Sequence, residues 1–194
     1  MGTAAGAALV VDRLTAHVDV VRALAGQADT IVRIAEAIEN ALRARRKVLV
    51  FGNGGSASDA EHLVGELLGR YQADRAALPA IALTANSSML TAVANDYGYA
   101  RVFARQLEAL GQTGDVAIAI STSGRSANVL EAFRIAKKHG LVTVALTGAG
   151  GLDTPETPDL VLAVPSSETP RIQEAHQVAI HCICELVERA WTAR

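Results

Sequence analysis

The sequence of 194 residues lacks the features that define several large classes of protein. Its apolar runs are broken by charged residues or glycine well before the roughly eighteen residues of a membrane-spanning helix, so we expect a soluble protein without a membrane segment. Lys and Arg number 18 against 20 Asp and Glu, a balance that gives no electrostatic footprint for nucleic acid. No basic segment precedes the first apolar one, which predicts a cytoplasmic location and no cleaved signal peptide.

Cysteine is also scarce, because the chain contains only Cys182 and Cys184. The two lie in an apolar segment that reads as helix, where side chains two residues apart diverge and a mutual disulfide is geometrically poor. We interpret both as core thiols and not as a redox or metal-binding pair. A chain of this length can bury a core without disulfides, so residues 1–194 are predicted to form a single domain.

Short aliphatic runs alternate with segments of helical periodicity. Nearly continuous apolar runs are typical of parallel strands that are covered on both faces. The predicted strands are 47–52, 80–85, 115–121, 141–147 and 160–165. The predicted helices are 8–25, a second from residue 29, 57–70, 87–94, 102–109, 128–138 and a last one with Thr169 as its N-cap and Pro170 at its first position. This alternation predicts an α/β fold, a three-layer αβα sandwich that begins with a helical pair.

Two loops rich in Gly and Ser follow the first and third predicted strands, at residues 52–58 and 121–128. In a parallel α/β sheet, ligands collect beyond the carboxyl ends of the strands, where helix N-termini favour anions. The second loop offers hydroxyl groups suited to a phosphate monoester. These hydroxyls belong to Ser121, Thr122, Ser123 and Ser126. Ordinary helix capping is the alternative, but four hydroxyls beside a glycine favour a phosphate site.

Two nucleotide-binding patterns are incomplete. Gly52, Gly54 and Ala57 fit G-x-G-x-x-A, but no acidic residue ends the second predicted strand, as an NAD site of the Rossmann type requires. A Walker A lysine is missing from the same loop. NAD and ATP are therefore disfavoured, and a sugar phosphate fits the two loops better.

His62 and Glu66 are four residues apart on a predicted helix, so they project from one face and could hold one metal ion. Gln173, Gln177 and His181 form a stripe on the last helix, and a His and a Gln from it could complete a set of nitrogen and oxygen ligands for zinc. A surface ion pair of His62 with Glu66, and a core position for His181, are the alternatives. The remaining histidines are interpreted as surface residues: His17, His139 and His176.

Four blocks of sequence resemble the signature blocks of the sugar isomerase (SIS) domain family, and more narrowly those of the phosphoheptose isomerases within it. The blocks are FGNGGSASDAEHLVGELLGRY (51–71), ANDYG (94–98), STSGRSANV (121–129) and RIQEAHQVAIH (171–181). The resemblance extends from the first helical pair to the C-terminus. It implies a flavodoxin-like sheet of five parallel strands and a homotetramer, with helices of about 8–45 in the subunit contacts.

The resemblance also implies a reaction and its residues. The substrate would be the sugar phosphate D-sedoheptulose 7-phosphate, isomerised through a metal-stabilised enediolate to D-glycero-D-manno-heptose 7-phosphate, the first step of nucleotide-activated heptose biosynthesis. Glu66 and His181 would exchange protons as base and acid beside one zinc ion per subunit. The implied zinc ligands are His62, Glu66, Gln173 and His181. The implied substrate-binding residues are Asn53, Gly54, Gly55, Ser56, Arg70, Asp96, Ser121, Thr122, Ser123, Ser126 and Gln173.

Two non-catalytic functions compete with the enzyme. One is a scaffold that resembles the DnaA initiator-associating protein, which shares the fold but lacks the catalytic Glu and the His of the last helix. This chain has both, as Glu66 and His181. The other is a sugar-phosphate sensor, but no basic helix-turn-helix segment is visible. Two residues depart from the family pattern: Pro170 stands where some members carry an acidic residue, and Gly65 replaces a bulkier one.

Overall fold

The computed structural model describes residues 2–193, in which five strands form one parallel sheet. The strands are β1 (Val48–Gly52), β2 (Ala80–Ala82), β3 (Val116–Ser121), β4 (Val142–Thr147) and β5 (Leu160–Ala163). They lie in the order β2-β1-β3-β4-β5, and every neighbouring pair is parallel. This is the flavodoxin-like order. The predicted sheet is confirmed, although each strand is shorter than the apolar run from which it was predicted.

Seven α-helices connect and flank the strands among the described residues. They are α1 (Thr3–Leu24), α2 (Ala28–Arg43), α3 (Gly55–Leu68), α4 (Ser87–Tyr97), α5 (Ala104–Leu110), α6 (Ala127–Lys138) and α7 (Thr169–Thr192), with short 3-10 turns at Ala25–Gln27 and Tyr99–Arg101. The predicted N-cap of the last helix was wrong by one residue, because Glu168 precedes the helix and Thr169 is already helical. Pro170 still falls in the first turn, where a backbone N–H has no helical partner to lose.

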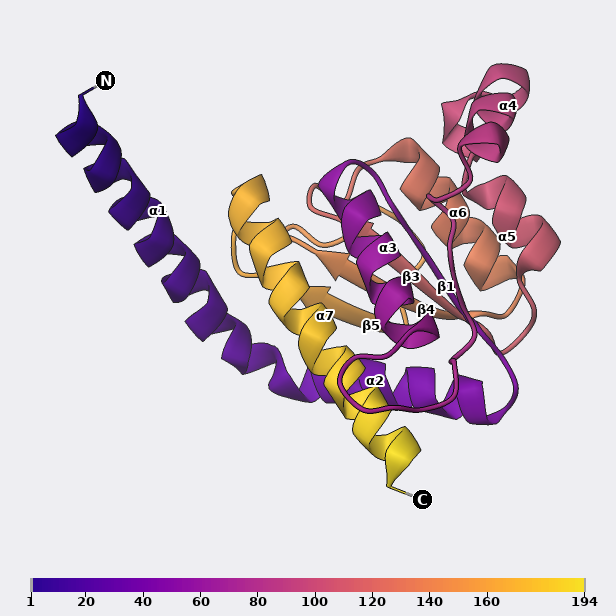
Figure 1. Ribbon diagram of the computed structural model, residues 1–194. Coiled ribbons are helices and arrows are strands. Elements are labelled where there is room, and N and C mark those ends of the chain that lie inside the picture. The colour runs from indigo at the N-terminus through magenta and orange to yellow at the C-terminus, as the bar shows by residue number, and fades with distance from the viewer. Residues whose placement is uncertain (1, 194) are drawn as a thin grey trace.

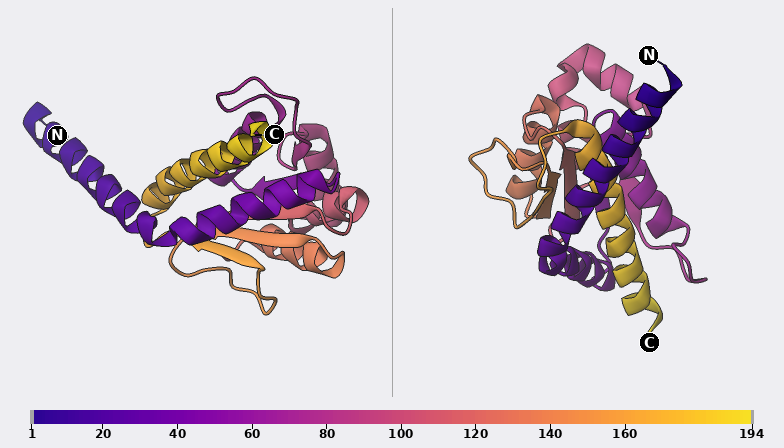
Figure 2. Two further views of the ribbon diagram at one scale, coloured as in Figure 1. Left: turned by 90° about the horizontal axis from the view of Figure 1, so that it is seen from below. Right: turned by 90° about the vertical axis from the view of Figure 1, so that its left-hand side faces the viewer.

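The side chains of the strands divide the core into two layers, because neighbouring residues of a strand face opposite sides of the sheet. Val48, Val50 and Ile118 pack with α2, α3 and α7, whereas Leu49 and Phe51 pack with α4, α5 and α6. Figures 1 and 2 show these two groups of helices on the two faces of the sheet. The predicted three-layer αβα architecture is therefore confirmed.

Helix α1 extends away from the sheet as an arm and contacts the rest of the chain along α7 (Figure 1). Leu24, at its end, is its one buried residue. Large apolar side chains along the arm are exposed: Leu9, Val10, Val11, Leu14 and Val18. Within residues 2–193, no helix is both long enough and apolar enough to cross a membrane.

Candidate active site

A cavity of about 260 Å³ opens beyond the carboxyl ends of β1 and β3. Its walls come from the two Gly/Ser-rich loops and from the start of α7. The lining residues are Asn53, Gly54, Gly55, Ser56, Ile120, Ser121, Thr122, Ser123, Ser126, Thr169 and Gln173. All the predicted substrate-binding residues except Arg70 and Asp96 are in this wall. The N-termini of α3 and α6 begin at these loops, and helix N-termini favour an anion.

The hydroxyls of the second loop remain available as donors. Ser121 Oγ accepts a hydrogen bond from the Gly124 N–H at 3.2 Å, and Ser123 Oγ accepts one from the Arg125 N–H at 3.3 Å. Each of these bonds uses a lone pair and leaves the O–H proton free to donate. Ser126 is the N-cap of α6, but its side chain makes no capping bond. Turn chemistry and phosphate binding are thus compatible at Ser121 and Ser123, and capping does not occupy Ser126.

Gly54 shapes the first loop. It has φ +57° and ψ −122°, a conformation that side chains other than glycine rarely adopt, and it directly precedes α3. At Gly55 the reason is space, because a Cβ atom there would lie 2.2 Å from Nε2 of Gln173 and would push that side chain away. Gly54 therefore permits the turn into α3, and Gly55 lets the Gln173 side chain lie against the loop in the cavity wall.

Asn53 is held by two residues that the sequence reasoning missed. Its carboxamide forms a reciprocal pair with that of Asn128, with both N···O distances at 2.9 Å, and Asn128 is 3% exposed. The Tyr99 hydroxyl donates to Asn53 Oδ1 at 3.2 Å. Since Oδ1 then accepts two bonds, Asn53 has one amide N–H left to offer to a ligand. Asn128 was within a recognised block, but nothing in the local pattern indicated its partner.

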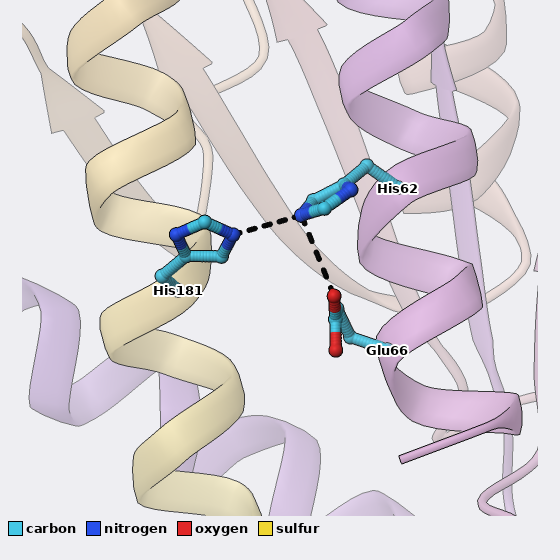
Figure 3. A group of neighbouring side chains, drawn as sticks. All are labelled: His62, Glu66 and His181. Carbon is cyan, nitrogen blue, oxygen red and sulfur yellow. Dashed lines mark hydrogen bonds and ion pairs between the residues drawn. The ribbon is translucent and has the colours of Figure 1, made fainter. Parts of the chain in front are cut away.

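A second group lies on the facing sides of α3 and α7 (Figure 3). Nε2 of His62 is 2.9 Å from Nε2 of His181 and 3.6 Å from Oε1 of Glu66. One ligand atom from each of the three lies within 4.8 Å of the others. Two imidazoles and one carboxylate form the His₂Glu donor set of catalytic zinc sites, which keep a fourth position open. The residues therefore fit a divalent ion, and His181 is exposed and not a core histidine.

Gln173 and Gln177 continue the stripe of His181 along α7. Gln173 lies eight residues before His181, about 12 Å along a helix axis, so only its long side chain could bring its oxygen to a shared ion. Gln177 instead donates to Oδ1 of Asp59 at 2.5 Å. Asp59 is 4% exposed, and burial raises its pKa although the bond from Gln177 and the nearby His62 oppose that rise. The sequence reasoning missed Asp59.

Arg70 and Asp96 lie outside the wall of the cavity. Arg70 is exposed and donates through Nη1 to the Gln72 carbonyl at 3.2 Å. Asp96 is exposed near the end of α4, where its Oδ1 accepts from Asn95 Nδ2 at 2.8 Å. Neither side chain is committed to the core, so both remain free to meet a ligand.

Two expectations about burial were wrong. His176 was predicted at the surface but is fully buried, because it faces the sheet and its Nε2 donates to the Thr147 carbonyl at 3.2 Å. Cys182 was predicted in the core but is exposed, because it is not on the buried face of α7 that includes Cys184. Cys184 is buried as predicted, and burial raises the pKa of its thiol to about 12. His17 is half-buried and bonds through Nδ1 to Oε2 of Glu174 at 2.8 Å.

Comparison with known proteins decides the family. The family model of the SIS domain matches residues 14–148, which are most of the chain. The chain belongs to the SIS domain family. Within it, a phosphoheptose isomerase of Roseiflexus sp. (strain RS-1) is 51% identical over 181 residues, which cover 93% of this chain and 92% of that protein. The prediction of an enzyme of the phosphoheptose isomerase family is thereby confirmed.

Solved structures agree with this membership. The structure of a phosphoheptose isomerase from Francisella tularensis has a TM-score of 0.91 and 34% identity, and the match covers 95% of this chain and 98% of that one. The phosphoheptose isomerase of Neisseria gonorrhoeae has a TM-score of 0.84 and 38% identity, with 92% and 96% of the two chains covered. The likeness therefore extends over almost the whole of this chain.

Proposed function

We propose that the protein converts D-sedoheptulose 7-phosphate to D-glycero-D-manno-heptose 7-phosphate, the first step of nucleotide-activated heptose biosynthesis. One observation carries this proposal: the hydroxyl-rich cavity and the His62, Glu66 and His181 group lie on the same helix pair. The start of α3 lines the cavity, and His62 follows Ser56 by six residues, about 9 Å along the helix. An open-chain heptose phosphate can reach from one to the other.

The phosphate end of the substrate fits the second loop. Free O–H groups of Ser121, Ser123 and Ser126, together with backbone N–H groups at the start of α6, offer donors to a phosphate without a fixed positive charge. Gly54 leaves space for the sugar chain beside the first loop, because nothing lies within 4 Å of the position that a Cβ atom would take there. The free amide N–H of Asn53 would then recognise a sugar hydroxyl.

The end of the substrate that carries C1 and C2 fits the group of His62, Glu66 and His181. A zinc ion held by His62, Glu66, His181 and Gln173, one per subunit, would acidify the C1–H and stabilise the charge of the enediolate. Glu66 would remove the proton from C1 as the base, and His181 would return one at C2 as the acid. Arg70 and Asp96, both exposed, would contact the sugar chain.

The exposed apolar side of α1 supports a homotetramer in which helices of about 8–45 join the subunit contacts. Exposed apolar residues clustered on one element are typical of a protein interface. The four chains would each contribute one SIS domain of residues 1–194 and work in the cytoplasm. Light scattering on the purified protein tests the tetramer, since a monomer would leave these side chains in water.

The direct test is to incubate purified protein with sedoheptulose 7-phosphate and follow the products by NMR, before and after chelation and with zinc re-added. An aldoheptose 7-phosphate that forms only with metal present supports both the reaction and the ion. Without turnover by the metal-loaded protein, the scaffold function would take its place.

A further inference from the structure

Glu188 is a buried carboxylate on α7. It binds the backbone of the segment after α3, residues 69–79, which passes beside the group of His62, Glu66 and His181. Glu188 follows His181 by two helical turns and is 5% exposed. Its Oε2 accepts the Tyr71 N–H at 2.9 Å, and its Oε1 accepts the N–H groups of Gln72 and Ala73, both at 2.8 Å. Three consecutive backbone donors on one carboxylate fix the local course of the chain. Residues 69–79 form neither helix nor strand, so this segment depends on such bonds.

Arg75 is the charge partner of Glu188 and ties the same segment to α3. Its Nε lies 3.3 Å from Oε2 of Glu188, and both side chains are buried. Its guanidinium also donates to the last carbonyls of α3, to Glu66 O at 2.6 Å and to Leu67 O at 2.9 Å. These carbonyls have no partner within their own helix. Arg75 and Glu188 therefore form a desolvated ion pair that joins the end of α3 to α7.

Arg75 and Glu188 bind two parts of the backbone that lie next to the proposed metal ligands. On α3 it holds the backbone of Glu66 itself. On the segment it holds Tyr71, whose ring centroid lies 5.8 Å from that of His181. Figure 1 shows the segment after α3 passing beside α7 at this point.

We propose that Glu188 and Arg75 are positioning residues for the metal site: they hold α3 and α7 at the separation that lets His62, Glu66 and His181 share one divalent ion. This inference rests on the proposed function. It goes beyond it because neither residue touches the substrate or the ion. A metal site needs ligands held in place by partners outside the ligand set, and loss of such a partner weakens metal binding.

Glu188→Gln tests this directly, because in either orientation of the amide an NH₂ group replaces one acceptor and faces a backbone N–H or Arg75. The matched control is Asp115→Asn. Asp115 is also a fully buried carboxylate that pairs with a cation, Lys47 at 2.7 Å, and accepts backbone N–H bonds, but it lies at the amino end of β3, away from the site. Both variants lose a buried charge, so both should unfold at a lower temperature.

Zinc affinity, measured by competition with a chromophoric chelator, distinguishes positioning from stability. We expect Glu188→Gln to bind zinc at least about tenfold more weakly than the wild type and to change the visible spectrum of the Co²⁺-substituted protein, with Asp115→Asn unchanged in both. Wild-type affinity and spectrum in Glu188→Gln would overturn the inference. If that variant does not fold, Arg75→Lys decides by the same criteria, since one ammonium group cannot reach both Glu188 and the α3 carbonyls.

The wild type separates this inference from the proposed function. Zinc-dependent turnover by the wild type together with unaltered zinc binding in the variants would reject the positioning role alone. Wild-type protein that binds no zinc and does not turn over would reject the function on which the inference rests.

Discussion

Nε2 of His62 lies 2.9 Å from Nε2 of His181, although 119 residues separate them in the chain. At this distance one nitrogen must carry a proton and the other must accept it. An ion between the rings would need a lone pair from both, so it would displace that proton to the opposite side of one ring. The packing of α3 against α7 thus brings the two proposed ligands together.

Glu66→Gln should abolish most of the turnover while leaving the fold intact. The side chain is 20% exposed, and the bond from Arg75 goes to the backbone of Glu66, so the substitution removes the carboxylate as base and as proposed zinc ligand without breaking that bond. Loss of a general base typically costs a factor of about 10²–10⁴, which we expect in kcat for sedoheptulose 7-phosphate. Glu61→Gln on the same helix, where Glu61 accepts only from Thr84, is the control. An unchanged kcat in Glu66→Gln would show that another group is the base.

Ser126→Ala should raise KM for the phosphate sugar with little loss of stability. The side chain caps nothing, so its removal leaves no helix bond unmade. Loss of one hydrogen bond to a charged phosphate is worth about 1.5–3 kcal/mol, a change in KM of roughly 10- to 150-fold. Steady-state kinetics and thermal unfolding measure the two effects. Ser88→Ala, an exposed serine on α4, should alter neither. If KM stayed at the wild-type value, the phosphate would have to bind elsewhere.

Most of the fold could be predicted from the sequence because the strands are buried on both faces. Such strands read as unbroken apolar runs, and the five runs predicted the five strands. Their ends could not be predicted, since β2 pairs over only three residues while its apolar run continues to Ala85. Apolarity reports burial, whereas a strand ends where its backbone partner ends.

The candidate site, too, could be predicted only in part. Residues near one another in the sequence, such as Ser121 and Ser126, could be assigned to one cavity because one loop carries them. Contacts between distant elements could not, as for Asn53 with Asn128. The two burial errors, His176 and Cys182, share a cause: a helical stripe fixes which residues share a face, but only packing decides which face meets the sheet.

Arg45→Gly should stabilise the protein, because relief of left-handed strain of about 1–2 kcal/mol exceeds the extra chain entropy that glycine loses on folding, about 0.5–1 kcal/mol. Arg45 has φ +57°, the one positive φ at a residue other than glycine among those described, and it follows the end of α2. The bond from the Arg46 N–H to Ala41 O at 2.9 Å requires this left-handed turn. Urea unfolding measures the gain. Arg46→Gly removes the same charge without relieving a strained φ and should stabilise nothing.

His176 should make the fold sensitive to mild acid. Its Nε2 donates to Thr147 O, so Nδ1 is the unprotonated nitrogen, and Nδ1 is buried without a partner. Burial lowers the pKa of His176 to about 4, from an ordinary 6.5. The unfolded chain therefore takes up the proton first, and stability that is complete above pH 6.5 is lost as the pH falls from 6.5 towards 4.

His176→Gln should remove this part of the acid sensitivity, because glutamine can donate to Thr147 O but does not titrate. Between pH 7 and pH 5, the wild type should lose about 2 kcal/mol more free energy of unfolding than the variant. Urea unfolding at the two pH values measures the difference, and His139→Gln provides the same substitution at a half-buried position. Equal losses in wild type and His176→Gln would mean that the buried imidazole accepts a proton in the folded state, which requires an acceptor or water at Nδ1.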